Sequence, residues 1–89
     1  MAKYLLITVC ERDIYTQKFD TLKDAHSTMM EELEREVADS RFEYSEDAWD
    51  NIKSKNEYAD TDLLFAFGEC WAWSNCDEDW KFDWQIIEI

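Results

Sequence analysis

The clearest hydrophobic pattern of this chain lies at its C-terminal end. Every second side chain is apolar there, at positions Trp80, Phe82, Trp84 and Ile86. The residues between them are polar as far as Gln85, and this alternation predicts a strand with one buried face. A polar run from Ser74 to Asp79 comes just before it and suits a turn. We therefore expect a C-terminal β-hairpin that supplies much of the core and presents an acidic tip.

The N-terminal segment predicts a second hairpin. Residues Tyr4 to Cys10 are rich in β-branched and aromatic side chains and are apolar on both faces, which is typical of a central strand. Ile14 to Phe19 has the pattern of a second strand, and it follows a short turn at residues 11–13. That turn lacks the Asn-Gly or Asp-Gly pair typical of tight hairpins, so the prediction depends on the strand patterns alone.

The middle of the chain changes to a helical period. Asp20 or Thr21 is expected to cap a long helix whose apolar side chains follow three- and four-residue steps: Leu22, Ala25, Met29, Leu33 and Val37. The outward stripe of this helix is predicted to be Asp24, Thr28, Glu31, Glu32, Arg35 and Asp39. A shorter helix is predicted to begin after Ser45 and to stop near Asn56, with Trp49 and Ile52 as its apolar contacts.

The remaining residues complete an α+β pattern. Glu57 to Asp62 is expected to be an acidic loop, and Leu63 to Phe67 a third strand. Gly68, the only glycine, is expected to mark a turn or bulge before a strand from Cys70 to Ser74. The predicted fold is one domain over residues 1–89 with the order β-β-α-α-β-β-β. Its sheet is mainly antiparallel, and the long helix packs on one face.

Charge is the feature of the composition that changes this picture most. The chain has 22 acidic and 9 basic residues among 89, a net charge of −13. Disorder is excluded because 46% of the residues are hydrophobic and 16% aromatic. A strongly negative surface repels nucleic acids and anionic membranes and attracts basic proteins. The N-terminus lacks the length and cleavage site of a signal peptide, and three cysteines without metal-binding spacing favour a reducing cytoplasm.

Candidate chemistry in the sequence is weak. Carboxylates are too numerous to single out a catalytic pair, and a chain of this size leaves little room for a substrate cleft. Cys10, Cys70, Cys76 and His26 do not have the spacing of a zinc site, and Asn75 to Asp79 lacks the glycine and terminal glutamate of a calcium-binding loop. We therefore expect a protein without enzymatic activity, cofactor or metal.

The acidic surface has two interpretations. It serves solubility, or its spaced carboxylates imitate the phosphates of nucleic acid, where duplex DNA carries about one charge per 1.7 Å. In the second case a Lys- and Arg-lined groove would bind this protein in place of nucleic acid. The candidate partner-binding residues are Glu31, Glu32, Asp39, Glu43, Glu46, Asp47, Asp50, Asp77, Glu78 and Asp79.

The tryptophans support two further hypotheses. Trp80 and Trp84 are expected in the core, whereas Trp71 and Trp73 share one face of their strand and at least one should be exposed. A sheet with two apolar faces but helices on only one leaves an apolar patch, which favours an interaction module such as a homodimer. Exposed tryptophans also suit a small-ligand or sugar-binding protein.

Three stretches carry a resemblance to known proteins. They are the opening KYLLITVCE, residues Phe19 to Ala25 at the start of the acidic helix, and Asp83 to Ile89 at the end. The chain resembles small orphan proteins of phages and conjugative elements of gut Firmicutes. Some small acidic phage proteins are anti-CRISPR or anti-restriction inhibitors. The resemblance implies a DNA mimic in the bacterial host cytoplasm that inhibits a basic partner such as a CRISPR nuclease and does not bind nucleic acid itself.

Overall fold

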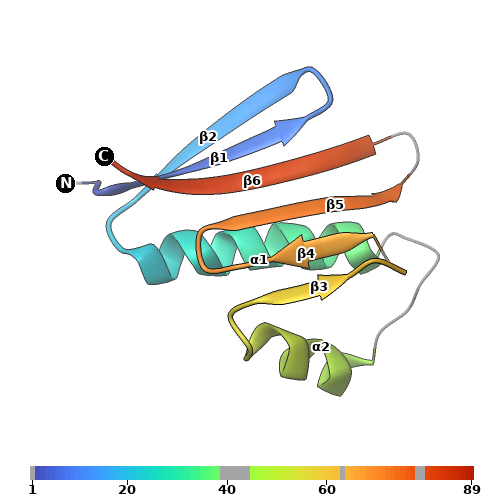
Figure 1. Ribbon diagram of the computed structural model, residues 1–89. Coiled ribbons are helices and arrows are strands. Elements are labelled where there is room, and N and C mark those ends of the chain that lie inside the picture. The colour runs from blue at the N-terminus through green and yellow to red at the C-terminus, as the bar shows by residue number, and fades with distance from the viewer. Residues whose placement is uncertain (1, 39–44, 63, 78–79) are drawn as a thin grey trace.

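The computed structural model describes residues 2–38, 45–62, 64–77 and 80–89, and these form one antiparallel sheet with two helices (Figure 1). The strand order is β2-β1-β6-β5-β4-β3. The strands are β1 (Tyr4–Cys10), β2 (Asp13–Phe19), β3 (Tyr58–Asp60), β4 (Phe65–Phe67), β5 (Trp71–Asp77) and β6 (Trp80–Glu88), and the helices are α1 (Leu22–Ala38) and α2 (Glu46–Lys53). The predicted α+β class, the two hairpins and the long helix on the sheet are confirmed.

Both helices begin as the sequence predicts. Thr21 Oγ1 accepts a hydrogen bond from the Asp24 backbone at 3.1 Å, and Ser45 Oγ accepts one from the Ala48 backbone at 3.2 Å. These side chains satisfy backbone N–H groups that have no partner within the first helical turn. After α2 ends, Asn56 adopts a φ of 59°, a left-handed conformation that asparagine tolerates.

The core lies between the sheet and one helical layer. Helix α1 contacts β1, β2, β5 and β6 and buries Ala25, Met29, Met30, Leu33 and Val37. Helix α2 adds Trp49 and Ile52 to the same buried cluster, and Trp49 packs on Phe65 with ring centroids 5.9 Å apart. The Cα extents are 39 × 30 × 16 Å, as expected for a two-layer slab of one sheet and one layer of helices.

One strand was not predicted. Tyr58–Asp60 lies in the expected acidic loop, yet it forms β3 and pairs with β4 at the edge of the sheet. A segment of three residues is too short for an alternation signal. The Tyr58 ring instead stacks on Phe65 and Phe67, with centroids 5.4 and 6.0 Å away, so tertiary packing forms this strand.

The C-terminal hairpin is longer than predicted. Strand β5 runs to Asp77, into the polar run that was expected to be the turn. Its register with β6 shifts between Ser74 and Asp77, which is the position of a bulge or irregularity. No helix in the described residues is long and apolar enough to cross a membrane.

Candidate functional site

The predicted acidic residues are only partly brought together. Glu31 on α1 and Glu46, Asp47 and Asp50 on α2 are exposed to solvent. Glu31, Glu46 and Asp47 form no ion pair with another described residue. Asp39, Glu43, Glu78, Asp79 and the side chain of Asp77 lie outside the part of the chain that the structure describes. The members of this set whose side chains the structure describes therefore lie on the two helices.

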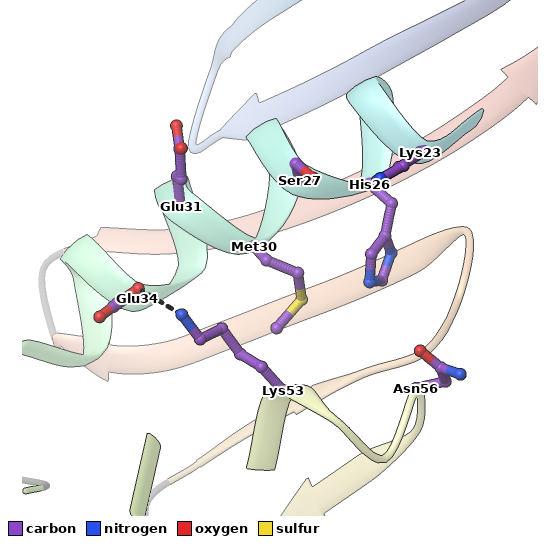
Figure 2. A pocket seen from close by; sticks show the side chains of 8 residues that line it. All are labelled: Lys23, His26, Ser27, Met30, Glu31, Glu34, Lys53 and Asn56. Carbon is purple, nitrogen blue, oxygen red and sulfur yellow. Dashed lines mark hydrogen bonds and ion pairs between the residues drawn. The ribbon is translucent and has the colours of Figure 1, made fainter. Parts of the chain in front are cut away.

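A groove between α1 and α2, which we call the helix groove, is lined by Glu31 from this set and by Glu34, which was not predicted (Figure 2). Its volume is about 400 Å³, and it is lined by Lys23, His26, Ser27, Met30, Glu31, Glu34, Lys53 and Asn56. A neighbouring hollow between the same helices is lined by Glu34, Val37, Ala38, Glu46 and Trp49. The seam formed by these two hollows is thus lined by Glu31, Glu34 and Glu46, although the Glu31 carboxylate points away from α2 (Figure 2).

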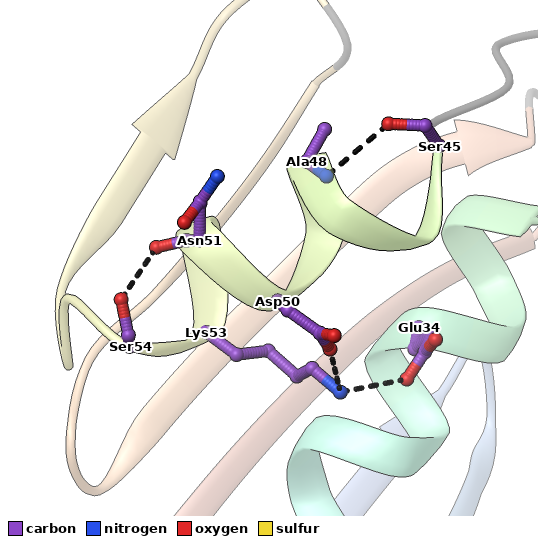
Figure 3. Close-up of polar contacts among 7 residues, drawn as sticks. All are labelled: Glu34, Ser45, Ala48, Asp50, Asn51, Lys53 and Ser54. Carbon is purple, nitrogen blue, oxygen red and sulfur yellow. Dashed lines mark hydrogen bonds and ion pairs between the residues drawn. The ribbon is translucent and has the colours of Figure 1, made fainter.

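Lys53 compensates part of this negative charge. Its ammonium lies 3.5 Å from Glu34 Oε2 and 3.4 Å from Asp50 Oδ1, and it joins the two helices (Figure 3). Asp50 and Lys53 belong to adjacent turns of α2, whereas Glu34 projects from α1. Lys23 is a second cation that lines the helix groove, and Glu31 and Glu46 are the carboxylates of the seam that Lys53 does not reach.

Glu32 does not belong to the outward stripe of α1, so the prediction for this residue was wrong. Its side chain is half-buried beneath α1, and its Oε2 atom is shielded from solvent. Gln17 Nε2 donates to Glu32 Oε1 at 3.4 Å, and Thr8 and Trp84 lie beside the carboxyl group. Burial raises the pKa of Glu32, although hydrogen-bond donors around it act in the opposite direction. Its place at the edge of the apolar stripe, one residue before Leu33, was the signal that it could turn inward.

The face of the sheet opposite the helices carries a second groove, which we call the aromatic groove. It has a volume of about 270 Å³, and its side chains on this face are Ile7, Val9, Trp71, Trp73, Asp83 and Gln85. Trp71 is 40% exposed, which confirms the prediction that at least one of the two tryptophans reaches solvent. Ile14 and Ile87, at 68% and 37% exposure, extend the apolar surface.

Strand β5 places its large side chains outward. Trp71 and Trp73 point to the open face, while Ala72 and Ser74 are buried beneath the helical layer. A strand usually turns its larger apolar side chains toward the core. In β5 small buried residues let α1 approach the sheet, and the indoles are left on the side that has no helix. Large exposed aromatic side chains are informative because they mark interaction sites.

Gly68 is required by the approach of an indole ring. It lies between β4 and β5, as predicted, and its N–H donates to the Trp71 carbonyl at 2.7 Å. A Cβ atom at this position would collide with Trp71 Nε1 and its neighbouring ring carbons. The glycine therefore allows the Trp71 ring to fold back over the turn.

The histidine and the described thiols have structural surroundings. His26 Nδ1 donates to the Glu69 carbonyl at 2.9 Å and so links α1 to the β4–β5 connection. Burial raises the pKa of the Cys10 and Cys70 thiols, with nearby carboxylates adding to the effect. Within the described ranges, no group of three potential ligand side chains could hold a metal ion.

Comparison of the chain with known proteins gives no further guide. No family model, curated protein or solved structure matches it. The resemblance to phage and mobile-element proteins therefore stays a prediction.

Proposed function

We propose that this protein is a non-enzymatic inhibitor that occupies the nucleic-acid groove of a basic protein. The observation that carries the proposal is the exposure of carboxylates on both helices, Glu31 on α1 and Glu46, Asp47 and Asp50 on α2, in a chain with a net charge of −13. Glu31, Glu46 and Asp47 are solvent-accessible and form no ion pair with another described residue. A row of carboxylates on a rigid body imitates the phosphates that a Lys- and Arg-lined groove is built to bind.

The partner we would test first is a CRISPR effector of a bacterial host. Such a protein holds nucleic acid in a positively charged channel and recognises it largely through backbone shape. A folded acidic competitor needs no sequence information to occupy that channel. Electrostatic steering would give fast association and exclude acidic proteins as partners.

The test is competition with nucleic acid across a panel of purified effectors. The protein should block DNA or RNA binding by one of them, and its affinity should fall steeply as salt is raised from 50 to about 500 mM. The triple variant Glu31→Lys, Glu46→Lys, Asp47→Lys should lose more than about tenfold in affinity, which is about 1.4 kcal/mol.

A matched triple variant separates imitation from general charge. Glu11→Lys, Asp13→Lys and Glu88→Lys change the net charge by the same amount at exposed positions away from the helices. This control should retain most of the affinity. Equal losses in both triple variants, or binding that is insensitive to salt, would rule out phosphate imitation by the helices.

The open sheet face favours a second candidate function, a homodimeric interaction module. Trp71, Ile14 and Ile87 form an apolar surface that a second copy could cover. Sedimentation velocity at micromolar concentration tests this: a stable dimer that Trp71→Lys dissociates would support it. The charge of −13 on each copy opposes self-association, so low salt should weaken such a dimer.

A further inference from the structure

The aromatic groove combines flat aromatic walls with one carboxylate. Trp71 and Trp73 come from β5, Asp83 and Gln85 form the floor on β6, and Ile7 and Val9 close the other side from β1. The only charged group among these side chains is Asp83, which is exposed. A site of this composition selects its ligand both by shape and by charge.

The strand register fixes how these groups meet. Trp73 is the Cα partner of Asp83, and Trp71 is the Cα partner of Gln85. Directly opposite side chains on neighbouring antiparallel strands have Cβ atoms about 4.5–5.5 Å apart. The indole of Trp73 and the carboxylate of Asp83 therefore stand side by side on the open face, as do the indole of Trp71 and the Gln85 amide.

Asp83 has no partner within the described protein. Its carboxylate forms no hydrogen bond or ion pair with another described side chain, although Lys81 lies two residues away on the same face of β6. An aromatic surface with an unpaired carboxylate at its edge attracts a cation that can stack and pair at once. Arginine does both, because its planar guanidinium stacks on aromatic rings and forms two parallel hydrogen bonds with a carboxylate.

We propose that the aromatic groove binds an arginine side chain of a basic protein partner. The proposal rests on the proposed function in one respect, that the partner is basic. Charge complementarity decides the occupant: a chain of −13 attracts a cationic surface, an anionic ligand would meet Asp83, and a second copy would bring two Asp83 carboxylates toward one another. The acidic helix layer steers the partner, and the opposite face of the slab supplies a specific contact.

Gly68 determines where the Trp71 wall of this site stands. Because a side chain at position 68 would collide with the Trp71 ring, Gly68→Ala must displace the indole. Trp71 is a partly exposed surface side chain, so it can move without disrupting the core. This variant changes the shape of the groove and leaves every charge in place.

The experiment is an NMR titration of the indole N–H groups with capped tripeptides. Gly-Arg-Gly should shift the Trp71 and Trp73 signals saturably, whereas Gly-citrulline-Gly, which has the same shape without the charge, should bind about tenfold more weakly. Asp83→Asn should lower the affinity for the arginine peptide by about fivefold. The matched charge control Glu57→Gln, at an exposed residue that lines neither groove, should change it by less than about twofold.

Several results would contradict the proposal that the aromatic groove binds arginine. These are equal binding of the citrulline peptide, equal effects of Asp83→Asn and Glu57→Gln, no shift at Trp71 and Trp73 at saturation, or no change in affinity with Gly68→Ala. Urea unfolding of each variant shows that the fold persists. A dimer whose interface contains Trp71 would also overturn it, because the second copy would then be the occupant.

The outcome is distinguishable from that of the proposed function. If a basic partner binds with steep salt dependence while Asp83→Asn and Gly68→Ala leave its affinity unchanged, the groove proposal alone fails. If no nucleic-acid-binding protein binds but the arginine peptide still shifts both indole signals, the inhibitor proposal fails and the arginine site remains.

Discussion

The two faces of the sheet use the same strands for different purposes. On β1, the inward residues Leu6, Thr8 and Cys10 are buried, whereas the outward residues Ile7 and Val9 are half-buried although they are as apolar as any core residue. The inward positions owe their burial to the helical layer, and the outward positions are shielded only by neighbouring side chains. The open face therefore carries apolar side chains that no helix covers.

Strands β5 and β6 sharpen this contrast. Strand β6 turns Trp84 and Ile86 inward and Asp83 outward, as a half-buried strand should. Strand β5 does the reverse, with Ala72 inward and Trp71 outward. Because β5 turns its indoles outward, Trp71 and Trp73 lie on the same open face as the Asp83 carboxylate of β6. The difference shows that the open face is not an uncovered core but a surface with its own mixed composition.

The largest difference in stability between the two faces is expected when two neighbouring leucines are each replaced by alanine. Leu6 is 0% exposed in the core, and Leu5 lies on the open face of the same strand. Leu6→Ala should lower the free energy of unfolding by about 2–5 kcal/mol, because it removes buried methylenes and leaves a cavity. Leu5→Ala should cost less than about 1.5 kcal/mol, since it was only partly removed from water. Urea unfolding at one pH and salt concentration measures both.

Similar losses of stability in Leu6→Ala and Leu5→Ala would contradict the expected difference between the two faces of the sheet. A large loss for Leu5→Ala would mean that the open face is covered in solution, for example by a second copy. Repeating the measurement over a range of protein concentrations decides this, because a dimer makes the apparent stability depend on concentration.

A smaller effect is expected from Glu32, the polar residue on the covered face. Glu32→Gln should raise the free energy of unfolding at neutral pH by about 1 kcal/mol or less, because a neutral amide lowers the cost of burial and the group remains partly solvated. The amide can also donate to Thr8 and accept from the Trp84 indole N–H. Glu31→Gln, one residue earlier and exposed, is the matched control for the change in net charge.

The pH dependence gives the sign of this effect. Burial raises the pKa of Glu32 in the folded state above its ordinary value of 4.5, so the folded state binds more protons than the unfolded state between the two values. Stability is therefore lost as the pH rises through that window. The advantage of Glu32→Gln over the wild type should be absent below pH 4 and grow as the pH rises, after subtraction of the Glu31→Gln profile. A flat difference would contradict the raised pKa and would mean that the groups around Glu32 offset its burial.

The sequence predicted those parts of this fold that repeat a local pattern. The alternation of β6, the helical steps of α1 and the capping role of Ser45 all needed only neighbouring residues, and the structure confirms them. Strand β3 could not be predicted in this way, because it depends on Tyr58 packing against rings that come later in the chain. The pattern of apolar residues shows which ones share a strand face, but not which face the helices will cover.

The candidate site was predicted by residue type rather than by position. Glu31 and Glu46 were correctly expected to be exposed, whereas Glu32 turned inward because the helix lies close to Thr8 and Trp84. Asp83 and Gln85 were identified only as the polar side of β6. Their role as a groove floor depends on the pairing of β6 with both β1 and β5, which joins the two ends of the chain.

The smallest effect tests how firmly α2 is attached to the covered face. Lys53→Met removes the cation shared by Glu34 and Asp50, and it should lower the free energy of unfolding by about 0.5 kcal/mol, because partly exposed ion pairs are screened by water. Lys55→Met is the control, since Lys55 is an exposed lysine that forms no described ion pair. The difference between the two variants should shrink from low salt to about 1 M salt, where screening is nearly complete. A difference that persists in high salt would instead indicate that the Lys53 methylenes pack between the helices, so that the attachment of α2 depends on apolar contact rather than on charge.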